Sequence, residues 1–272
     1  IRQREGFMTI VGDVGTGKTT LCRCLLDRLD KNVRVALILN PMLSDIDLLK
    51  TCLHDLGVKP ARRNRARLVA AAAGSANPEY PAGADIRDFD SSWCDTLSKK
   101  ELIDHLNVFL LKQHEEGKST VLIIDEAQNL SWEVMEQLRI LSNLETEREK
   151  LIQIILVGQP QLKAKLENAK LEQFRQRIAV YYHLNSLNRN ETEEYILHRL
   201  KLVSSNGIDI FTPEAMNLIY KCSSGIPRIV NLVCDSALLS GYVYEEKKIT
   251  EKIIDEVIKE RDQMRPELTE RK

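Results

Sequence analysis

The sequence predicts an α/β fold in which a five-stranded parallel sheet, covered by helices, is followed by a small helical domain. Five short apolar runs alternate with helical patterns, at residues 7–11, 33–39, 120–124, 152–157 and 179–182. Strands that alternate with helices in this way are typical of a parallel sheet. The runs VLII and IQIILV are almost continuously hydrophobic, which indicates strands that are buried on both faces.

Two of the helices between these runs have clear end signals. Ser44 precedes the helical pattern DIDLLKTCLHDL, and Gly57 follows it. Ser98 and Glu101 have the spacing of a capping box, in which two side chains bond the backbone reciprocally, and Gly117 closes that helix. These signals bound two helices of the α/β part.

After about residue 185 the strand-like runs stop. The remaining patterns are helical, over residues 191–205, 213–223, 227–244 and 251–263. Pro213 and Pro227 fall at first-turn positions, where a missing backbone N–H does no harm. We therefore expect an α/β domain over residues 1–185 and a helical domain over residues 186–272.

One stretch, at about residues 59–96, interrupts this rhythm. It is first rich in arginine, then in alanine, and then in proline, glycine and aspartate. A connection of this length without periodicity is uncommon inside a compact domain. It is interpreted as a flexible surface insertion; the alternatives are an anomaly of the sequence and an anion-binding patch formed by Arg62, Arg63, Arg65 and Arg67.

The overall composition excludes several classes of protein. With 272 residues, 43% of them hydrophobic and 29% charged, the chain is long enough to bury a substantial core. The net charge of -1 gives no general attraction to nucleic acid or to an anionic membrane. No apolar run approaches the roughly 20 residues of a membrane-spanning helix, and the start, IRQREGF, lacks a signal-peptide pattern. We therefore expect part of a cytoplasmic protein.

Six cysteines are scattered along the chain, with no CxxC pair and no histidine at zinc-ligand spacing. We interpret them as small buried hydrophobic side chains in a reducing compartment. A redox or metal pair at Cys22 and Cys24 is the alternative, but positions two apart on a helix point to different faces.

The string GDVGTGKTT follows the first apolar run and opens a helical pattern, a context that predicts a phosphate-binding loop, or P-loop. Glycines let consecutive backbone N–H groups face inward around an anion, and the following helix adds its positive N-terminal end. A glycine turn that binds nothing is the alternative. The predicted nucleotide-binding residues are Gly12, Asp13, Val14, Gly15, Thr16, Gly17, Lys18, Thr19 and Thr20.

Four side chains are expected to carry the chemistry of phosphate transfer. Lys18 should reach the β- and γ-phosphates, and the hydroxyl of Thr19 should coordinate Mg²⁺. The string VLIIDEAQNL puts Asp125 and Glu126 at the carboxyl end of a buried strand, where ligands of open α/β sheets bind. We expect Asp125 to hold Mg²⁺, directly or through water, and Glu126 to orient and deprotonate the attacking water. Two solvated acids at a strand end are the alternative.

Several strings together resemble one family. GDVGTGKTTLCRCLLDRL, LIIDEAQNL, EQLRILSNLET, IQIILVGQPQL and GIPRIVNLVCDSAL, in this order, are similar to the AAA+ domain of the ExeA or GspA-type ATPases of type II secretion. The resemblance covers nearly all of the chain apart from the insertion. It implies a P-loop NTPase fold of the AAA+ type, with a small C-terminal helical lid domain, that binds ATP and Mg²⁺.

The resemblance also implies roles for four residues outside the loop. Gln159 falls at the sensor 1 position, near the γ-phosphate, and Arg228 falls at sensor 2. Arg175 and Arg177 lie where the family has arginine fingers; Arg177 is the better match and Arg175 the reserve. A finger acts on the nucleotide of a neighbouring subunit, which implies a homo-oligomer. The alternatives are a surface Arg228 and an Arg177 paired with an acid such as Glu172.

By this resemblance we expect an Mg²⁺-dependent ATPase that powers the assembly or remodelling of a type II secretion or envelope complex through a protein partner. A tether to the inner membrane would come from parts of the protein outside this sequence, as would the segment that helps hold adenine in relatives. The alternative is a DNA-handling ATPase of the transposition or replication-initiation type, which shares the P-loop, the acidic pair and a GxPR string. Lysine and arginine are dispersed here and no helix-turn-helix string stands out, which weakens that alternative. A nucleotide-gated binding module with little turnover is the third hypothesis.

Overall fold

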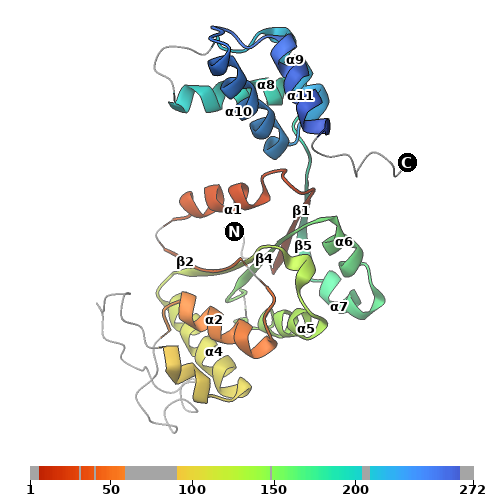
Figure 1. The fold of residues 1–272 in the computed structure, drawn as a ribbon. Coiled ribbons are helices and arrows are strands. Elements are labelled where there is room, and N and C mark those ends of the chain that lie inside the picture. Colours follow the sequence, from red (N-terminus) through yellow and green to blue (C-terminus); the bar gives the residue numbers. More distant parts are fainter. Residues whose placement is uncertain are drawn as a thin grey trace. The chain divides into compact units, whose positions relative to one another are not determined.

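The computed structural model describes residues 6–30, 32–39, 41–58, 91–147, 149–203 and 209–263. The chain forms two compact units, which Figure 1 shows as ribbons. The first unit comprises Ile1–Val11 and Lys18–His183, and the second comprises Gly12–Gly17 and Leu184–Lys272. The assignment of residues 1–185 and 186–272 as functional domains stays a prediction.

A five-stranded sheet with the strand order β2-β3-β4-β1-β5 forms the centre of the first unit. The strands are β1 (Phe7–Gly12), β2 (Val33–Ile38), β3 (Ser119–Ile124), β4 (Gln153–Gly158) and β5 (Ile178–Leu184). The pairings of β2 with β3, β3 with β4 and β4 with β1 are parallel. The predicted α/β fold with a five-stranded parallel sheet is therefore confirmed. Because β3, β4 and β1 are neighbouring strands that run parallel, the segments that follow them leave the same edge of the sheet.

Helices cover both faces of this sheet. They include α1 (Lys18–Asp27), α2 (Asp45–Asp55), α4 (Lys99–Glu115) and α5 (Trp132–Leu141). On one face, Leu122 and Ile124 pack into the core that contains side chains of α2, α4 and α5, while Val121 and Ile123 pack on the other face with Cys22 of α1. Successive side chains of a strand point to opposite faces, so the continuous apolar run of β3 supplies both layers.

The predicted helix ends are confirmed. Ser44 caps α2 in a capping box with Asp47, and Ser98 caps α4 in a capping box with Glu101. Gly57 and Gly117 follow the two helices with φ of 70° each, a left-handed backbone that suits glycine.

Several short elements of the first unit have no counterpart in the sequence analysis. They are η2 (Ser91–Thr96), η3 (Ala127–Asn129), α6 (Pro160–Leu166), η4 (Ala169–Leu171) and α7 (Glu172–Arg175). Elements of three to seven residues have too few turns to show a periodic apolar pattern. The ring of Phe174 from α7 packs on that of Phe7 from β1, with centroids 4.2 Å apart, so α7 is fixed by tertiary packing.

The second unit has its own apolar core, built from α8 (Arg189–Val203), α9 (Pro213–Ser223), α10 (Pro227–Val243) and α11 (Glu251–Gln263). Pro213 and Pro227 occupy the first turns of α9 and α10, as predicted. Two backbone hydrogen bonds join the segments before α9 and α11, from Thr212 N–H to the Ile249 carbonyl at 3.0 Å and from Ile249 N–H to the Ile210 carbonyl at 2.8 Å. In the described residues, no helix has the length and apolar character needed to cross a bilayer.

The predicted insertion falls largely outside the described residues, including Arg62, Arg63, Arg65 and Arg67. Its last part is regular, because residues 91–96 form the 3-10 helix η2. Cys94 of this helix is buried in the core. The expectation of an irregular stretch is therefore wrong for residues 91–96.

All six cysteines are free thiols. Cys22, Cys52 and Cys94 are buried, as expected, and burial raises the pKa of the Cys52 thiol to about 12. Cys24 is exposed, so the expectation of a buried side chain is wrong there. Cys22 and Cys24 point to different faces of α1 because they are two positions apart.

Candidate nucleotide site

The segment between β1 and α1 forms a tight turn. The N–H of Thr16 donates to the carbonyl of Asp13 at 3.3 Å, and the Thr16 hydroxyl donates to the same oxygen at 2.9 Å. Gly15 and Gly17 have φ of 86° and 95°, a left-handed backbone that other residues rarely adopt. The glycine turn predicted from the sequence therefore has the backbone conformation that only its glycines permit at low cost. Asp13 and Val14 are exposed on this turn.

Within the second unit, the first turn of α10 lies against this glycine turn. The backbone N–H of Arg228 donates to the carbonyl of Gly15 at 3.2 Å. A Cβ atom on Gly15 would lie 2.9 Å from the Cβ of Arg228, and one on Gly12 would lie 2.7 Å from the carbonyl oxygen of Leu184. The side chain of Arg228 is exposed. Glycine is required at both positions because the backbone approaches closely.

In the first unit, the start of α1 meets the end of β3. The hydroxyl of Thr19 donates to Oδ2 of Asp125 at 2.6 Å, and the N–H of Glu126 donates to Oδ1 at 2.9 Å. Asp125 is buried, and its own N–H donates to the carbonyl of Ile38 in β2 at 2.8 Å. Lys18, the first residue of α1, is also buried, whereas Thr20 is exposed.

The oxygen atoms of Thr19 and Asp125 suit Mg²⁺. Mg²⁺ prefers hard oxygen ligands and is commonly held by one or two protein groups, with phosphate and water oxygens completing its shell. The buried carboxylate and the hydroxyl 2.6 Å from it match this pattern. Among the described residues, no cluster of three His, Cys, Asp or Glu side chains could hold a metal. An Mg²⁺ ion held by Thr19 and Asp125 would take its other ligands from phosphate and water oxygens.

Glu126 lies in a small network of amide groups. Its carboxylate oxygen Oε2 accepts from Nε2 of Gln128 at 2.5 Å and from Nε2 of Gln159 at 3.0 Å. The backbone N–H of Gln159, which directly follows β4, donates to Oε1 of Gln128 at 3.0 Å. The structure thus brings Gln159 to Glu126. The sequence analysis missed Gln128, although it stands two residues after Glu126 in the string DEAQNL.

The two candidate finger arginines differ in their surroundings. The guanidinium of Arg177 donates to the hydroxyl of Ser142 at 3.2 Å and to the side-chain oxygen of Asn143. Arg175, the last residue of α7, is exposed, and within the described residues no hydrogen bond or ion pair holds its side chain. The partners of Arg177 are therefore Ser142 and Asn143, rather than the Glu172 that the alternative interpretation named.

Comparison with known proteins identifies the family. The family model described as "AAA domain" matches residues 1–166. General secretion pathway protein A of Aeromonas hydrophila is 36% identical over 244 residues, which cover 90% of this chain and 38% of that protein. The chain thus spans well under half the length of this relative. The resemblance stated from the sequence strings is confirmed.

Solved structures share the fold at low identity. The ADP form of the Aeropyrum pernix ORC2 protein has a TM-score of 0.63 at 16% identity, covering 97% of this chain and 65% of that chain. Cdc6p from Pyrobaculum aerophilum has a TM-score of 0.59 at 15% identity, covering 93% and 60%. The RuvB Holliday junction branch migration motor of Thermotoga maritima has a TM-score of 0.53 at 17% identity, covering 94% and 61%. At these identities the likeness concerns the fold alone. The P-loop sequence, the parallel sheet and the match to the family model together establish that this chain belongs to the AAA-domain family of ATPases.

Proposed function

We propose that this chain is an Mg²⁺-dependent ATPase that powers the assembly or remodelling of a type II secretion or envelope complex. One observation carries the catalytic part: Thr19, at the start of α1, and Asp125, at the end of β3, are joined by a 2.6 Å hydrogen bond. This contact brings together the two groups that phosphate transfer needs near the metal. The 36% identity to general secretion pathway protein A supports the secretion role.

The phosphate groups would be held by the segment that ends β1 and opens α1. The N–H groups of Gly12–Gly17, the amine of Lys18 and the N-terminal end of α1 all favour an anion. Thr19 and Asp125 would hold Mg²⁺, and when bound this ion would neutralise charge on the β- and γ-phosphates. Arg228 is proposed as sensor 2, because its helix begins beside Gly15.

Glu126 is proposed as the general base. Its carboxylate would accept the proton of a water molecule whose oxygen forms a bond to the γ-phosphorus, while the bond from that phosphorus to the β-phosphate oxygen breaks. The products are ADP and inorganic phosphate. Gln159 is proposed as sensor 1, because its amide contacts the Glu126 carboxylate at 3.0 Å.

The contacts of the two arginines favour Arg175, the second candidate, as the arginine finger. The guanidinium of Arg177 is engaged by Ser142 and Asn143 of the same chain. Arg175 is exposed, so it can reach a neighbouring subunit without first breaking those bonds. We therefore place the finger at Arg175 in a homo-oligomer, with Arg177 fixing the segment that precedes β5.

The wider role is proposed from a relative of whose length this chain spans 38%. We propose that the protein works on the cytoplasmic side of the inner membrane, on a secretion or envelope-assembly protein. If duplex DNA stimulated ATP turnover, with a stimulation that fell steeply as salt was added, the DNA-handling alternative would replace this proposal.

Two substitutions test the ATPase site. Glu126→Gln should bind ATP with unchanged affinity and hydrolyse almost none, because an amide cannot accept the proton. Lys18→Ala should bind ATP too weakly for calorimetry to detect. Glu167→Gln makes the same chemical change at the exposed residue that directly follows α6 and should hydrolyse ATP at the normal rate. Ordinary turnover by Glu126→Gln would remove Glu126 from this role.

A further inference from the structure

We propose that Gln128 is a positioning residue for ATP hydrolysis, which holds the carboxylate of Glu126 in its working orientation and ties it to the end of β4. The inference rests on the proposed function, because it takes Glu126 as the base. Gln128 itself would touch neither the nucleotide nor the attacking water.

Both the nitrogen and the oxygen of the Gln128 side-chain amide form hydrogen bonds. Its nitrogen lies 2.5 Å from Oε2 of Glu126, and its oxygen lies 3.0 Å from the backbone nitrogen of Gln159. A rotation of the amide by half a turn would put oxygen against carboxylate and N–H₂ against N–H, so both contacts would become repulsive. The chemistry of the two partners thus fixes the orientation of the amide.

The two amide donors define how the Glu126 carboxylate lies. Both hydrogen bonds that the structure shows for this side chain, from Gln128 and from Gln159, reach Oε2. Two donors on one oxygen restrict rotation about the last side-chain bond and leave Oε1 as the oxygen directed away from them. A general base must present one oxygen to the water at a fixed position, and this arrangement does so.

The backbone of Glu126 adds to this constraint. Its φ of 52° is left-handed, a conformation that is unfavourable for a residue other than glycine. Two hydrogen bonds offset this cost, from its N–H to Asp125 and from Asn129 N–H to its carbonyl. The left-handed turn sends the Glu126 side chain toward the end of β4, where the amides of Gln128 and Gln159 meet it.

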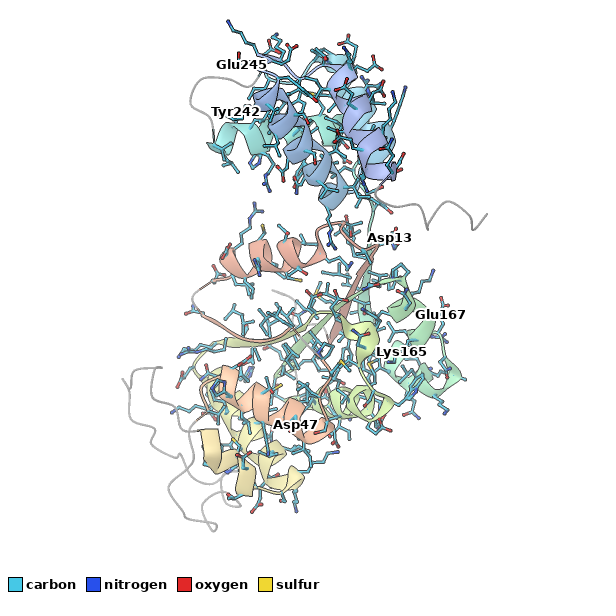
Figure 2. The ribbon with its side chains drawn as sticks, viewed as in Figure 1. Asp13, Asp47, Lys165, Glu167, Tyr242 and Glu245 are labelled. Atoms are coloured by element: carbon cyan, nitrogen blue, oxygen red, sulfur yellow. The ribbon has the colours of Figure 1, made fainter. Side chains whose placement is uncertain are left out.

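Gly158 and Lys165 also constrain the position of Gln128. A Cβ atom on Gly158, the last residue of β4, would lie 2.8 Å from Oε1 of Gln128, so a larger residue there would displace that oxygen. Behind the turn, the amine of Lys165 donates to the main-chain carbonyl of Gln128 at 3.1 Å and to that of Leu130. Lys165 is labelled on α6 in Figure 2. Gln128 is therefore held from β4 through its side chain and from α6 through its backbone.

The test compares three substitutions. Gln128→Glu keeps the shape and the oxygen that accepts from Gln159, but replaces the donor to Glu126 by a repelling carboxylate. Gln128→Ala removes both contacts. Asn129→Ala changes the next, exposed residue of the same 3-10 helix and serves as the control.

We expect kcat to fall about tenfold or more in Gln128→Glu and Gln128→Ala, since a positioned base contributes about 10²-fold or more. KM and the affinity for ATP should stay within about twofold of the wild type, because no phosphate contact is lost. Asn129→Ala should match the wild type. Unchanged ATP affinity also shows that the variants fold. Normal or raised turnover of Gln128→Glu would overturn the proposal.

A combined variant separates positioning from a merely structural role. In the Glu126→Gln background, Gln128→Glu should cause no further loss of the residual single-turnover rate, because there is no base left to position. A second tenfold loss would show that Gln128 acts apart from Glu126 and would overturn the inference. Normal turnover by Glu126→Gln alone would instead overturn the proposed function. An inactive Glu126→Gln with a fully active Gln128→Glu would overturn only the role of Gln128.

Discussion

The hydroxyl of Thr19 donates to the carboxylate of Asp125, with Oγ1 2.6 Å from Oδ2. The two residues lie 106 positions apart in sequence. They meet because parallel strands end at the same edge of the sheet, so the helix that follows β1 begins near the end of β3. This contact joins the segment that would hold phosphate to the segment that would hold water.

Removal of the Thr19 hydroxyl should uncouple ATP affinity from Mg²⁺. A hydrogen bond to a charged group is worth about 1.5 to 3 kcal/mol, and the loss of a ligand to Mg²⁺ should cost at least as much, so Thr19→Ala should lower ATP affinity in excess Mg²⁺ about tenfold or more. Thr19→Ser keeps the hydroxyl and should retain most of the affinity. Calorimetric titrations with ATP, with and without Mg²⁺, measure the effect. An equal gain from Mg²⁺ in wild type and Thr19→Ala would rule out this ligand.

Substitution of Arg175 should lower ATP turnover only when the subunits are assembled. We expect Arg175→Ala to reduce the turnover of the oligomer strongly, since a finger is worth about 10³ to 10⁵ in rate. Mixing it with Lys18→Ala protein should restore part of the activity, because each variant supplies what the other lacks.

Arg177→Ala serves as the comparison for Arg175→Ala. It should lower the melting temperature, because Ser142 and Asn143 lose their donor. Rescue by Lys18→Ala that occurs with Arg177→Ala and not with Arg175→Ala would reverse the assignment. If neither variant is rescued while assembly is intact, no finger acts between subunits.

Gly225→Ala should destabilise the second unit. Gly225 has φ of 70°, and a Cβ atom there would lie 1.8 Å from the carbonyl oxygen of Leu187. Since backbone must move, we expect a loss of about 2 to 4 kcal/mol in the free energy of unfolding. Gly117→Ala is a matched control with the same φ and, apart from its two chain neighbours, nothing within 4 Å of its Cβ, and it should cost about 1 to 2 kcal/mol. Equal losses in denaturant unfolding would contradict the steric argument.

His105 should make the first unit sensitive to acid. Burial lowers the pKa of this imidazole. The negative charges of Glu101 and Asp104 raise the pKa, but by less than burial lowers it. Below the unfolded pKa of 6.5, the unfolded chain binds a proton that the folded chain does not, so the free energy of unfolding falls as the pH drops from 6.5 toward the folded pKa. Well above pH 6.5 neither the folded nor the unfolded chain binds this proton, so His105 does not lower the free energy of unfolding there.

His105→Phe should flatten that dependence. A phenyl ring can keep the edge-to-face contact with Trp93, whose ring centroid lies 5.2 Å from that of His105, and it does not titrate. Urea unfolding at about pH 7.5, 6.5 and 5.5 measures the slopes around the reference pKa. Equal slopes for the two proteins would show that His105 is not the cause.

Local sequence signals predicted a large part of the fold. The five apolar runs became β1 to β5 with ends shifted by at most two residues, and Ser44, Ser98, Pro213 and Pro227 start their helices as predicted. The short helices α6 and α7 were missed. Their residues are held by contacts such as Phe174 on Phe7, which involve positions far apart in the chain.

The sequence by itself determined the glycine turn, the acidic pair after a buried strand and the family, because each depends on residue types at fixed short spacings. Only the tertiary structure decided that Thr19 meets Asp125, that Gln128 and Gln159 share one oxygen of Glu126, and that Arg177 is engaged by Ser142 and Asn143. These contacts depend on the strand order β2-β3-β4-β1-β5, which sets the ends of β3, β4 and β1 side by side. Short-range patterns carry no information about which strands become neighbours, since pairing is fixed by packing across the whole sheet.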